Sequence, residues 1–585
     1  MVRLFAAVAL ALAVLGGLAA RADAHATLES TTPERGAALE RAPGEVVLRF
    51  SEPVEIAFGA VQVFDGAGKQ VAEGDAYHPD GAGTAVAVPL PPDLPEGGYT
   101  VTFRVISADS HPVAGGFTFG VGAGAAAPAT PVADLLAGQD SGPVTSVAFA
   151  VVRAIQYGAI ALGLGVLAVL LVAWFPALRS NAAFDGAAAP FRGRAEVLLL
   201  AAAGAGVASA LVGLVLQTAV AGGTSFWSAL GDTGTILETR FGVVWGLGAV
   251  AWAFVLVAVT MARATEQRRL PRIAGGAPDA PRDSAGPNGL LVIPGAALLA
   301  LALLPGLGGH AGTQEPVAVL LPANVLHVLA AGAWIGGIAT LVVALPAATR
   351  RLEPSERTRL LVAVLARFSA LALVAVAVLL TGGIVQSIVQ LGAFDDLLDT
   401  SFGRAILVKA GLVCGLLALG WLNRRRILPA LDRPGPPGRA GLLLRRSLRT
   451  EVALGAAALA ATGALAGYTP ATARTAGPFS GSAEAGPARV DLTVDPARPG
   501  PNELHLYMFN RDDGSQYDAT REMTVTAALP ERGIEPIRLR ASKAGPGHYL
   551  VARAPLSPAG EWEIEIAARI TEFDELRTTF TVPVE

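Results

Sequence analysis

Two stretches that lie far apart in the sequence carry residues suited to a metal ion. Asp109 and His111 stand two positions apart at the end of a run with strand-like alternation, so on extended backbone both side chains share one face. His25 adds an imidazole and, if the chain is cleaved directly before it, a free α-amino group. Three nitrogens and one carboxylate oxygen in a tetragonal arrangement suit Cu(II), which also leads the affinity order of divalent first-row metals.

The same residues have a simpler interpretation, in which Asp109 and His111 pair across a turn and His25 is a frayed terminus. In either case, the cysteine and methionine content of the chain limits the types of metal ligand that are available. The single cysteine, Cys414, excludes intramolecular disulfides and thiolate clusters, so any bound metal has nitrogen and oxygen ligands. The chain has four methionines and residues 25–122 contain none, so we expect no methionine-rich Cu(I) site there.

Residues 1–24 predict a cleaved secretory signal peptide. Arg3 opens a short basic region, an apolar run follows, and Ala22-Asp23-Ala24 supplies the small residues of a signal-peptidase site. An uncleaved anchor helix is the alternative, but the apolar run is shorter than the roughly 20 residues that a membrane span needs. Cleavage after Ala24 makes His25 the first residue of the mature chain.

Two segments are patterned as β domains. Short runs of alternating polar and apolar residues, separated by Gly, Pro and Asp, predict an all-β sandwich or barrel over residues 25–122. Residues 488–585 predict a second sandwich, of immunoglobulin-like type, with Trp562 in its core. Stretches rich in Ala, Gly and Pro predict linkers at 123–147 and 471–487. The two β segments hold 13 acidic against 5 basic and 16 against 11 residues, which argues against nucleic acid as a partner.

The region between the β segments is strongly apolar and holds eight stretches long enough to span a bilayer. They lie near residues 148–175, 196–218, 241–262, 289–307, 321–346, 363–390, 403–422 and 451–468. The loops on one side of these spans hold 20 Arg and no Lys, whereas the alternate loops hold only Arg240. Because basic loops stay cytoplasmic, this asymmetry predicts an eight-helix transmembrane bundle over 148–470, with both termini and both β domains outside.

Two histidines lie within the predicted membrane region, where burying a polar side chain costs free energy and such a residue therefore points to a function. His310 falls at the outer end of the fourth predicted span and His327 near the outer start of the fifth, so antiparallel helices would let them face each other. Gly332, Gly336 and Gly337 allow close helix approach nearby. A metal relay and simple hydrogen bonding between helices both remain open on these residues alone.

The segments HATLESTTPERGAALERAPGEVVLRFSEPVE and VISADSHPVAGGFTFGVG strongly resemble the CopC family of periplasmic copper-binding proteins. The resemblance covers essentially all of residues 25–122. It implies that His25, Asp109 and His111 hold Cu(II). Many members also carry a methionine-rich Cu(I) site, which this segment lacks the residues to build.

The membrane region resembles the CopD family of inner-membrane copper proteins. The resemblance is carried by HxxAxxxWxGG from His327 to Gly337, ARFSALAL, TSFGRAILVKAGL and NRRRILPAL, and it spans about 148–470. It implies that intramembrane histidines handle copper, which favours His310 and His327 as relay ligands. Residues 488–585 look more loosely like YtkA-type domains, through PGHY and GEWEIEI. There His505 and His548 have no companion nearby in sequence and are interpreted as packing residues.

Together the resemblances imply a copper-binding protein of the bacterial plasma membrane. Its first β domain would capture Cu(II) outside, and its membrane domain would transport copper across, with uptake favoured, in copper homeostasis or resistance. The expected partners are the copper ion, the lipid bilayer and a periplasmic copper chaperone or oxidase-assembly protein. We expect no enzymatic activity, and the chain has no GxxxxGK[ST] P-loop for ATP coupling.

Two other functions also fit these residues. The membrane domain would be a haem-dependent cupric reductase if His310, His327 and another ligand held a single haem. Alternatively, the protein would be a copper sensor or chaperone that docks on a partner through its second sandwich.

Overall fold

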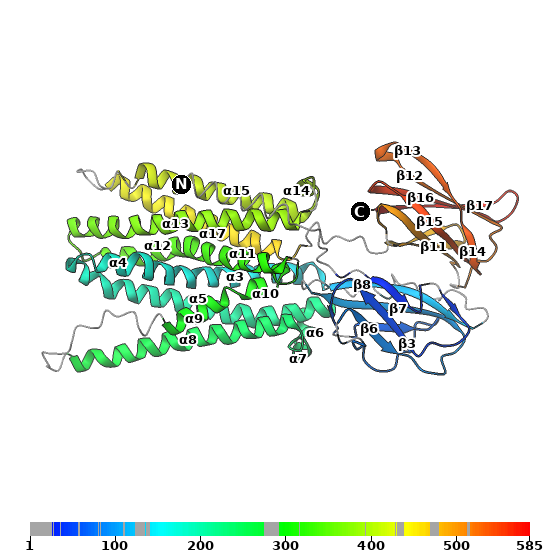
Figure 1. Cartoon of the computed structure of the whole chain (residues 1–585), viewed down its shortest axis with the longest axis horizontal. Coiled ribbons are helices and arrows are strands. Elements are labelled where there is room, and N and C mark those ends of the chain that lie inside the picture. The colour runs from blue at the N-terminus through cyan, green and yellow to red at the C-terminus, as the bar shows by residue number, and fades with distance from the viewer. Residues whose placement is uncertain are drawn as a thin grey trace. The chain divides into compact units, whose positions relative to one another are not determined.

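The computed structural model divides into two units (Figure 1). One is helical and holds Ser141–Val220 and Ser225–Thr472; the other holds the two β domains, within Asp23–Asp140 and Ala473–Glu585, and Ala221–Thr224. The structure describes residues 26–108 except 27, 36, 57, 58, 80 and 82, then 112–122, 135, 141–273, 292–391 except 315, 394–427, 429, 438–468, 479–511 except 496, and 515–584. The predicted signal peptide and the predicted ligands His25, Asp109 and His111 lie outside the described residues.

The first β domain is an all-β sandwich, as its alternating pattern predicts. Its sheets have the strand orders β1-β3-β6 and β2-β8-β7-β4, and β5 pairs with β7. The strands are β1 (Leu28–Thr32), β2 (Ala38–Leu39), β3 (Glu45–Phe50), β4 (Val54–Glu55), β5 (Val61–Phe64), β6 (Ala85–Pro89), β7 (Gly97–Ser107) and β8 (Pro112–Val121). Val46, Leu48, Val86 and Val101 lie fully buried between the sheets. β7 and β8 form a long hairpin whose paired residues run from Gly97 and Val121 to Ile106 and Pro112.

The second β domain is also a sandwich of two antiparallel sheets, with orders β14-β15-β11-β10-β9 and β13-β12-β16-β17. The strands are β9 (Phe479–Ala485), β10 (Ala488–Asp495), β11 (Gly500–Asn510), β12 (Glu522–Leu529), β13 (Ile534–Leu539), β14 (Ser542–Gly545), β15 (His548–Leu556), β16 (Gly560–Arg569) and β17 (Glu575–Val584). Trp562 is fully buried, as expected, and its Nε1 donates to the Pro558 carbonyl at 2.9 Å. Strand β9 lies inside the segment that the sequence predicts as a linker, because a run of Gly, Ala and Ser carries little strand signal.

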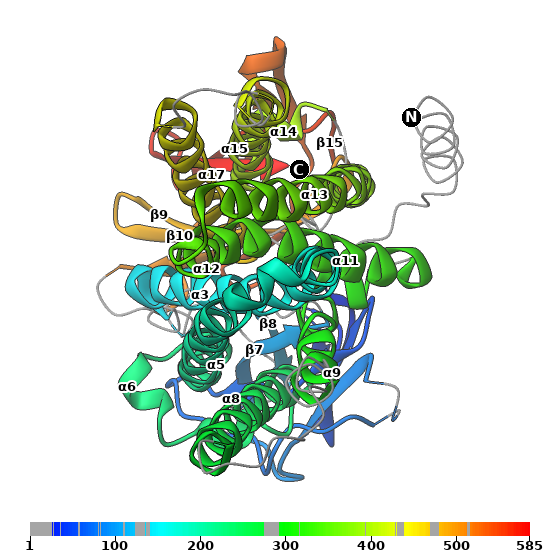
Figure 2. The same ribbon diagram turned by 90° about the vertical axis from the view of Figure 1, so that its left-hand side faces the viewer.

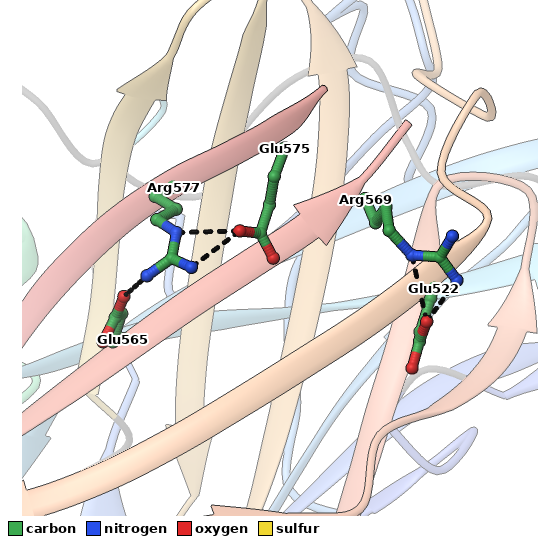
Figure 3. A network of polar contacts seen from close by, with 5 residues as sticks. All are labelled: Glu522, Glu565, Arg569, Glu575 and Arg577. Atoms are coloured by element: carbon green, nitrogen blue, oxygen red, sulfur yellow. Dashed lines mark hydrogen bonds and ion pairs between the residues drawn. The ribbon is translucent and has the colours of Figure 1, made fainter. Parts of the chain in front are cut away.

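Ion pairs on the outer face of the second domain join β12, β16 and β17 (Figure 3). Arg569 pairs with Glu522, while Arg577 bonds Glu575 at 2.7 Å and Glu565 at 3.0 Å. The five side chains are 36–63% exposed, and surface pairs of this kind contribute about 0–1 kcal/mol each. The stability of the domain therefore comes from its apolar core.

Within the described residues, the helical unit contains seven segments long and apolar enough to cross a membrane. They correspond to seven of the eight predicted spans. Figure 2 shows the helices nearly end-on. The principal helices are α3 (Gly142–Ala168), α4 (Phe175–Leu178), α5 (Asp185–Gly222), α8 (Arg240–Ile273), α11 (Val317–Ala331), α12 (Gly337–Thr349), α13 (Pro354–Gln390), α15 (Ser401–Leu422) and α17 (Gly438–Leu465). Short helices are α6 (Phe226–Ala229), α7 (Thr233–Ile236) and α14 (Asp396–Asp399), and π-helical turns are η1 (Val169–Trp174), η5 (Gly332–Gly336) and η6 (Asn423–Ile427).

The fourth predicted span is different. Its described part consists of α9 (Val292–Leu301) and α10 (Leu304–Leu307), which together form a shorter apolar segment than the other seven. Pro305 stands in the first turn of α10. Its ring would clash with the carbonyl of Leu301, four residues earlier, so α9 ends there.

Glycines hold α3 against η5 at backbone contact. A Cβ on Gly336 would lie 1.8 Å from the Ala161 carbonyl oxygen, and one on Gly165 would lie 2.0 Å from the Gly336 carbonyl carbon. A Cβ on Gly332 or Gly337 would also come closer than 3.0 Å to a neighbouring side chain. The predicted close approach at these glycines is confirmed. η5 directly follows α11, the helix that carries His327.

We expect Gly336→Ala to destabilise the helical unit, because its methyl group overlaps the backbone of α3 and overpacking of this kind costs about 1–3 kcal/mol. The measurement is the thermal unfolding midpoint of the full chain in detergent. Gly158→Ala in α3 is the matched control, since nothing lies within 4 Å of its Cβ position. Equal midpoints for the two variants would contradict the close contact.

Candidate metal centres

The first candidate centre is the predicted Cu(II) site, and the structure describes residues on either side of its ligands. The amide of Ala26 donates to Ser107 Oγ at 3.3 Å, and both residues are almost completely buried. Ser107 Oγ in turn donates to Glu52 Oε1 at 2.5 Å. This chain of bonds ties the residue directly after His25 to the end of strand β7, eighty-one positions along the sequence.

The other two predicted ligands belong to the connection between β7 and β8. β7 ends at Ser107, β8 begins at Pro112, and Ile106 pairs with Pro112 across the hairpin. Successive Cα atoms are about 3.8 Å apart, so covalent connectivity alone keeps His25, Asp109 and His111 within a few residues of the bond between Ala26 and Ser107. The geometry of the three side chains lies outside the described residues, and the Cu(II) site stays a prediction.

The membrane histidines lie on neighbouring elements. His310 begins a short 3-10 turn, η4 (His310–Gly312), between α10 and α11. His327 lies within α11, which packs against η4 and along α13. The structure thus brings the elements of His310 and His327 together, although no direct contact between the two side chains follows from this.

His327 belongs to a group of partly or fully buried polar residues that we call the α11–α13 polar cluster: Gln314, Asn324, His327 and Gln386. Asn324 Nδ2 donates to Gln386 Oε1 at 3.3 Å, and Gln386 Nε2 donates to the Gly382 carbonyl at 3.0 Å. Gln314 Nε2 donates to the Val389 carbonyl at 3.3 Å. Asn324 and His327 are three positions apart on α11 and therefore share a face toward α13.

Three atoms of this cluster are buried without a hydrogen-bond partner: His327 Nδ1, Asn324 Oδ1 and Gln314 Oε1. A buried acceptor left unpaired costs about 1–3 kcal/mol. Gly382 of α13 packs closely against this part of α11, since a Cβ there would lie 3.3 Å from the Ala323 carbonyl oxygen and 3.6 Å from His327 Nδ1. Each of these unpaired nitrogen and oxygen atoms could coordinate a cation, which would take the place of the missing hydrogen-bond partner.

In the membrane region only the histidines were predicted as part of a site, and the amide side chains of Gln314, Asn324 and Gln386 were not. The signal was present, because Asn and Gln inside an apolar span are as informative as His. A second buried polar contact was missed for the same reason: Asn423 in η6 donates to Glu451 of α17, whose side chain is almost fully buried. Among the described residues, no group of three or more His, Cys, Asp or Glu side chains is placed to hold a metal ion.

Comparison with known proteins agrees with this domain order. The model of the CopC domain matches residues 28–122, and the model named copper resistance protein D matches residues 362–465. The latter match begins after His310 and His327. The copper transport protein CutJ of Bacillus subtilis is 27% identical over 578 residues, which cover 95% of either chain.

Two further relatives match the first β domain alone. Copper resistance protein C of Escherichia coli is 33% identical over 113 residues, which cover 18% of this chain and 87% of that protein. The crystal structure of CopC from Methylosinus trichosporium OB3b is 33% identical, covers 17% of this chain and 93% of its own, and gives a TM-score of 0.16.

A first β-sandwich, a bundle of several apolar helices and a second β-sandwich define a multipass membrane protein with appended β domains. The chain belongs to the CopC family through its first β domain, and its membrane region carries a CopD domain.

We expect Ser107→Ala to weaken Cu(II) binding by the full chain about 10–100-fold, the usual cost of removing an outer-shell contact, because Ala26 loses the bond that anchors the segment after His25. Competition titration with a Cu(II) chelator measures this. Ser146→Ala, which removes an exposed hydroxyl bonded only within α3, is the control. Equal affinities would show that this anchor does not position the ligands.

Proposed function

We propose that this protein captures Cu(II) outside the bacterial plasma membrane with its first β domain and transports copper inward through its helical unit. The observation that carries the proposal is the end-to-end match to CutJ, a protein named for copper transport, across both β domains and the membrane region. The protein acts as a transporter in copper homeostasis or resistance and not as an enzyme.

Capture uses His25, Asp109 and His111. The α-amino and imidazole nitrogens of His25, the Asp109 carboxylate and the His111 imidazole supply the tetragonal nitrogen and oxygen set that Cu(II) prefers. The bond from Ala26 to Ser107 supports this arrangement, because it fixes the start of the mature chain beside the β7–β8 connection. The excess of acidic residues in this domain would attract the cation.

Passage begins at the α11–α13 polar cluster. With the Arg-rich loops in the cytoplasm, the connection between α10 and α11 faces outward, so an incoming ion would reach His310 and the cluster from the outer side. Both β domains then lie outside, where a periplasmic copper chaperone or an oxidase-assembly protein has access to them.

Adding one residue ahead of His25 in the mature protein removes the α-amino ligand and leaves the fold unchanged. We expect the extension to lower Cu(II) affinity in a chelator competition and to change the Cu(II) electron paramagnetic resonance spectrum, because one nitrogen donor is lost. The intact mass of the exported protein establishes whether cleavage follows Ala24. Unchanged affinity and spectrum would rule out the amine as a ligand.

In vesicles containing the purified protein, we expect His327→Leu and Asn324→Leu to reduce the initial rate of radioactive copper uptake about tenfold or more, since each removes a donor atom from the path. Leu326→Ala is the matched control, because Leu326 lies between them on α11 and is 53% exposed. Uptake equal to wild type in both cluster variants would make these residues packing residues.

The same preparation separates the two rival functions. A haem-dependent cupric reductase would show a haem absorbance spectrum after purification, and a sensor or chaperone would bind copper without moving it. Copper uptake by haem-free protein is the result expected of a transporter.

A further inference from the structure

Two histidines of the second β domain, distant in sequence, lie side by side on one sheet. His505 is on β11 and His548 is on β15, and these strands pair antiparallel with Tyr507 directly opposite His548. His505 is therefore the diagonal neighbour of His548, within reach across the strands. Leu504 and Leu506 point into the core, so His505 and Tyr507 occupy the opposite face of the sheet.

The two imidazoles meet nitrogen to nitrogen. His505 Nδ1 lies 3.2 Å from His548 Nε2, the ring centroids are 5.5 Å apart, and the ring planes differ by 17°. The centroid separation is close to the nitrogen separation plus the two ring radii, so both nitrogens lie near the line that joins the ring centres. The N–H of one ring therefore points at the in-plane lone pair of the other.

Neighbouring side chains hold this arrangement. The Tyr507 ring stacks on His548 with centroids 4.3 Å apart and planes within 12°, which sets the plane of that imidazole. On the far side of His505, Glu503 Oε2 lies 3.8 Å from Nε2. A carboxylate there favours the tautomer with the proton on Nε2 and leaves the Nδ1 lone pair facing His548. Metal-binding histidines commonly donate a hydrogen bond from their second nitrogen, and Glu503 lies within about 1 Å of the distance at which it would accept one.

Both rings are in the protonation state that binds metals. Burial, with a further contribution from His505, lowers the pKa of His548 to about 4, and burial also lowers the pKa of His505. Both imidazoles are therefore neutral at pH 7, and neutral imidazole is a good ligand for copper.

We propose that His505 Nδ1 and His548 Nε2 bind one Cu(I) ion in a linear two-nitrogen site. Two metal–nitrogen bonds of about 2.0–2.1 Å in line span about 4 Å, so the rings need to separate only slightly from their present position. The hydrogen-bonded proton moves to the other nitrogen of its own ring, and no electron is transferred. Two ligands suffice for Cu(I), whereas Cu(II) requires more than this pair supplies. The identity of the metal rests on the proposed function.

The test uses the full chain in detergent, titrated anaerobically with Cu(I) against a coloured Cu(I) chelator. We expect His505→Gln and His548→Gln each to lose one Cu(I) equivalent relative to wild type. His78→Gln is the control, since His78 bonds the Ala85 carbonyl in the first β domain and should keep the full number. Equal stoichiometry in all four proteins would overturn the site.

Two further measurements guard against a variant that merely misfolds. Glu503→Gln keeps both rings, and we expect the same stoichiometry with about 10–100-fold weaker binding, whereas unchanged affinity would remove Glu503 from the site. X-ray absorption of the Cu(I)-loaded wild type should show two nitrogen neighbours. Sulfur ligands, or three or more ligands, would contradict the linear geometry.

Copper uptake measured on the same proteins separates this site from the proposed function. If His548→Gln loses its Cu(I) equivalent but even the wild type moves no copper, the transport proposal fails and the site stands. If the wild type transports copper and the Cu(I) count never changes, the site fails and transport stands.

Discussion

A polar atom withdrawn from water needs a partner, and this requirement organises each candidate binding site of the molecule. In the first β domain the buried amide of Ala26 finds Ser107, and that bond brings the N-terminal segment to the β7–β8 end. In the second domain His505 and His548 share a hydrogen bond, so each ring has a partner for one of its nitrogens. In the membrane unit the requirement is only partly met, since His327 Nδ1 and Asn324 Oδ1 are left without a hydrogen-bond partner.

Much of the fold was accessible from the sequence because its signals are local. Strand alternation appears directly in β10, where buried and half-buried residues alternate along the whole strand. Span length is equally local, and seven predicted spans correspond to long apolar helices. The departures are also physical. Pro305 ends α9 early, and the serine- and alanine-rich strand β9 is held by its pairing with β10, since its own composition carries little strand signal.

The sites were less accessible, because they depend on contacts between distant residues. His505 and His548 are separated by 43 positions, and only the pairing of β11 with β15 makes them neighbours. Each therefore resembled an isolated packing residue in the sequence. The CopC-type ligands could be predicted because a histidine after a signal-peptidase site and an Asp-Ser-His-Pro stretch are visible in the sequence itself, and they stay a prediction. The amides of the α11–α13 polar cluster were missed because attention fell on histidine alone.

The charge of each site bears on the order in which copper would meet them. The first site includes a carboxylate within an acidic domain, which suits tight capture of a divalent ion from dilute solution. The α11–α13 polar cluster contains only amides and one imidazole, so it offers donor atoms without a compensating negative charge. An ion passes through a membrane only if each site binds it strongly enough to admit it and weakly enough to release it. If the proposed function holds, the α11–α13 polar cluster would meet both conditions, because its unpaired oxygen and nitrogen atoms can coordinate a cation and the cluster contains no carboxylate that would hold the ion there.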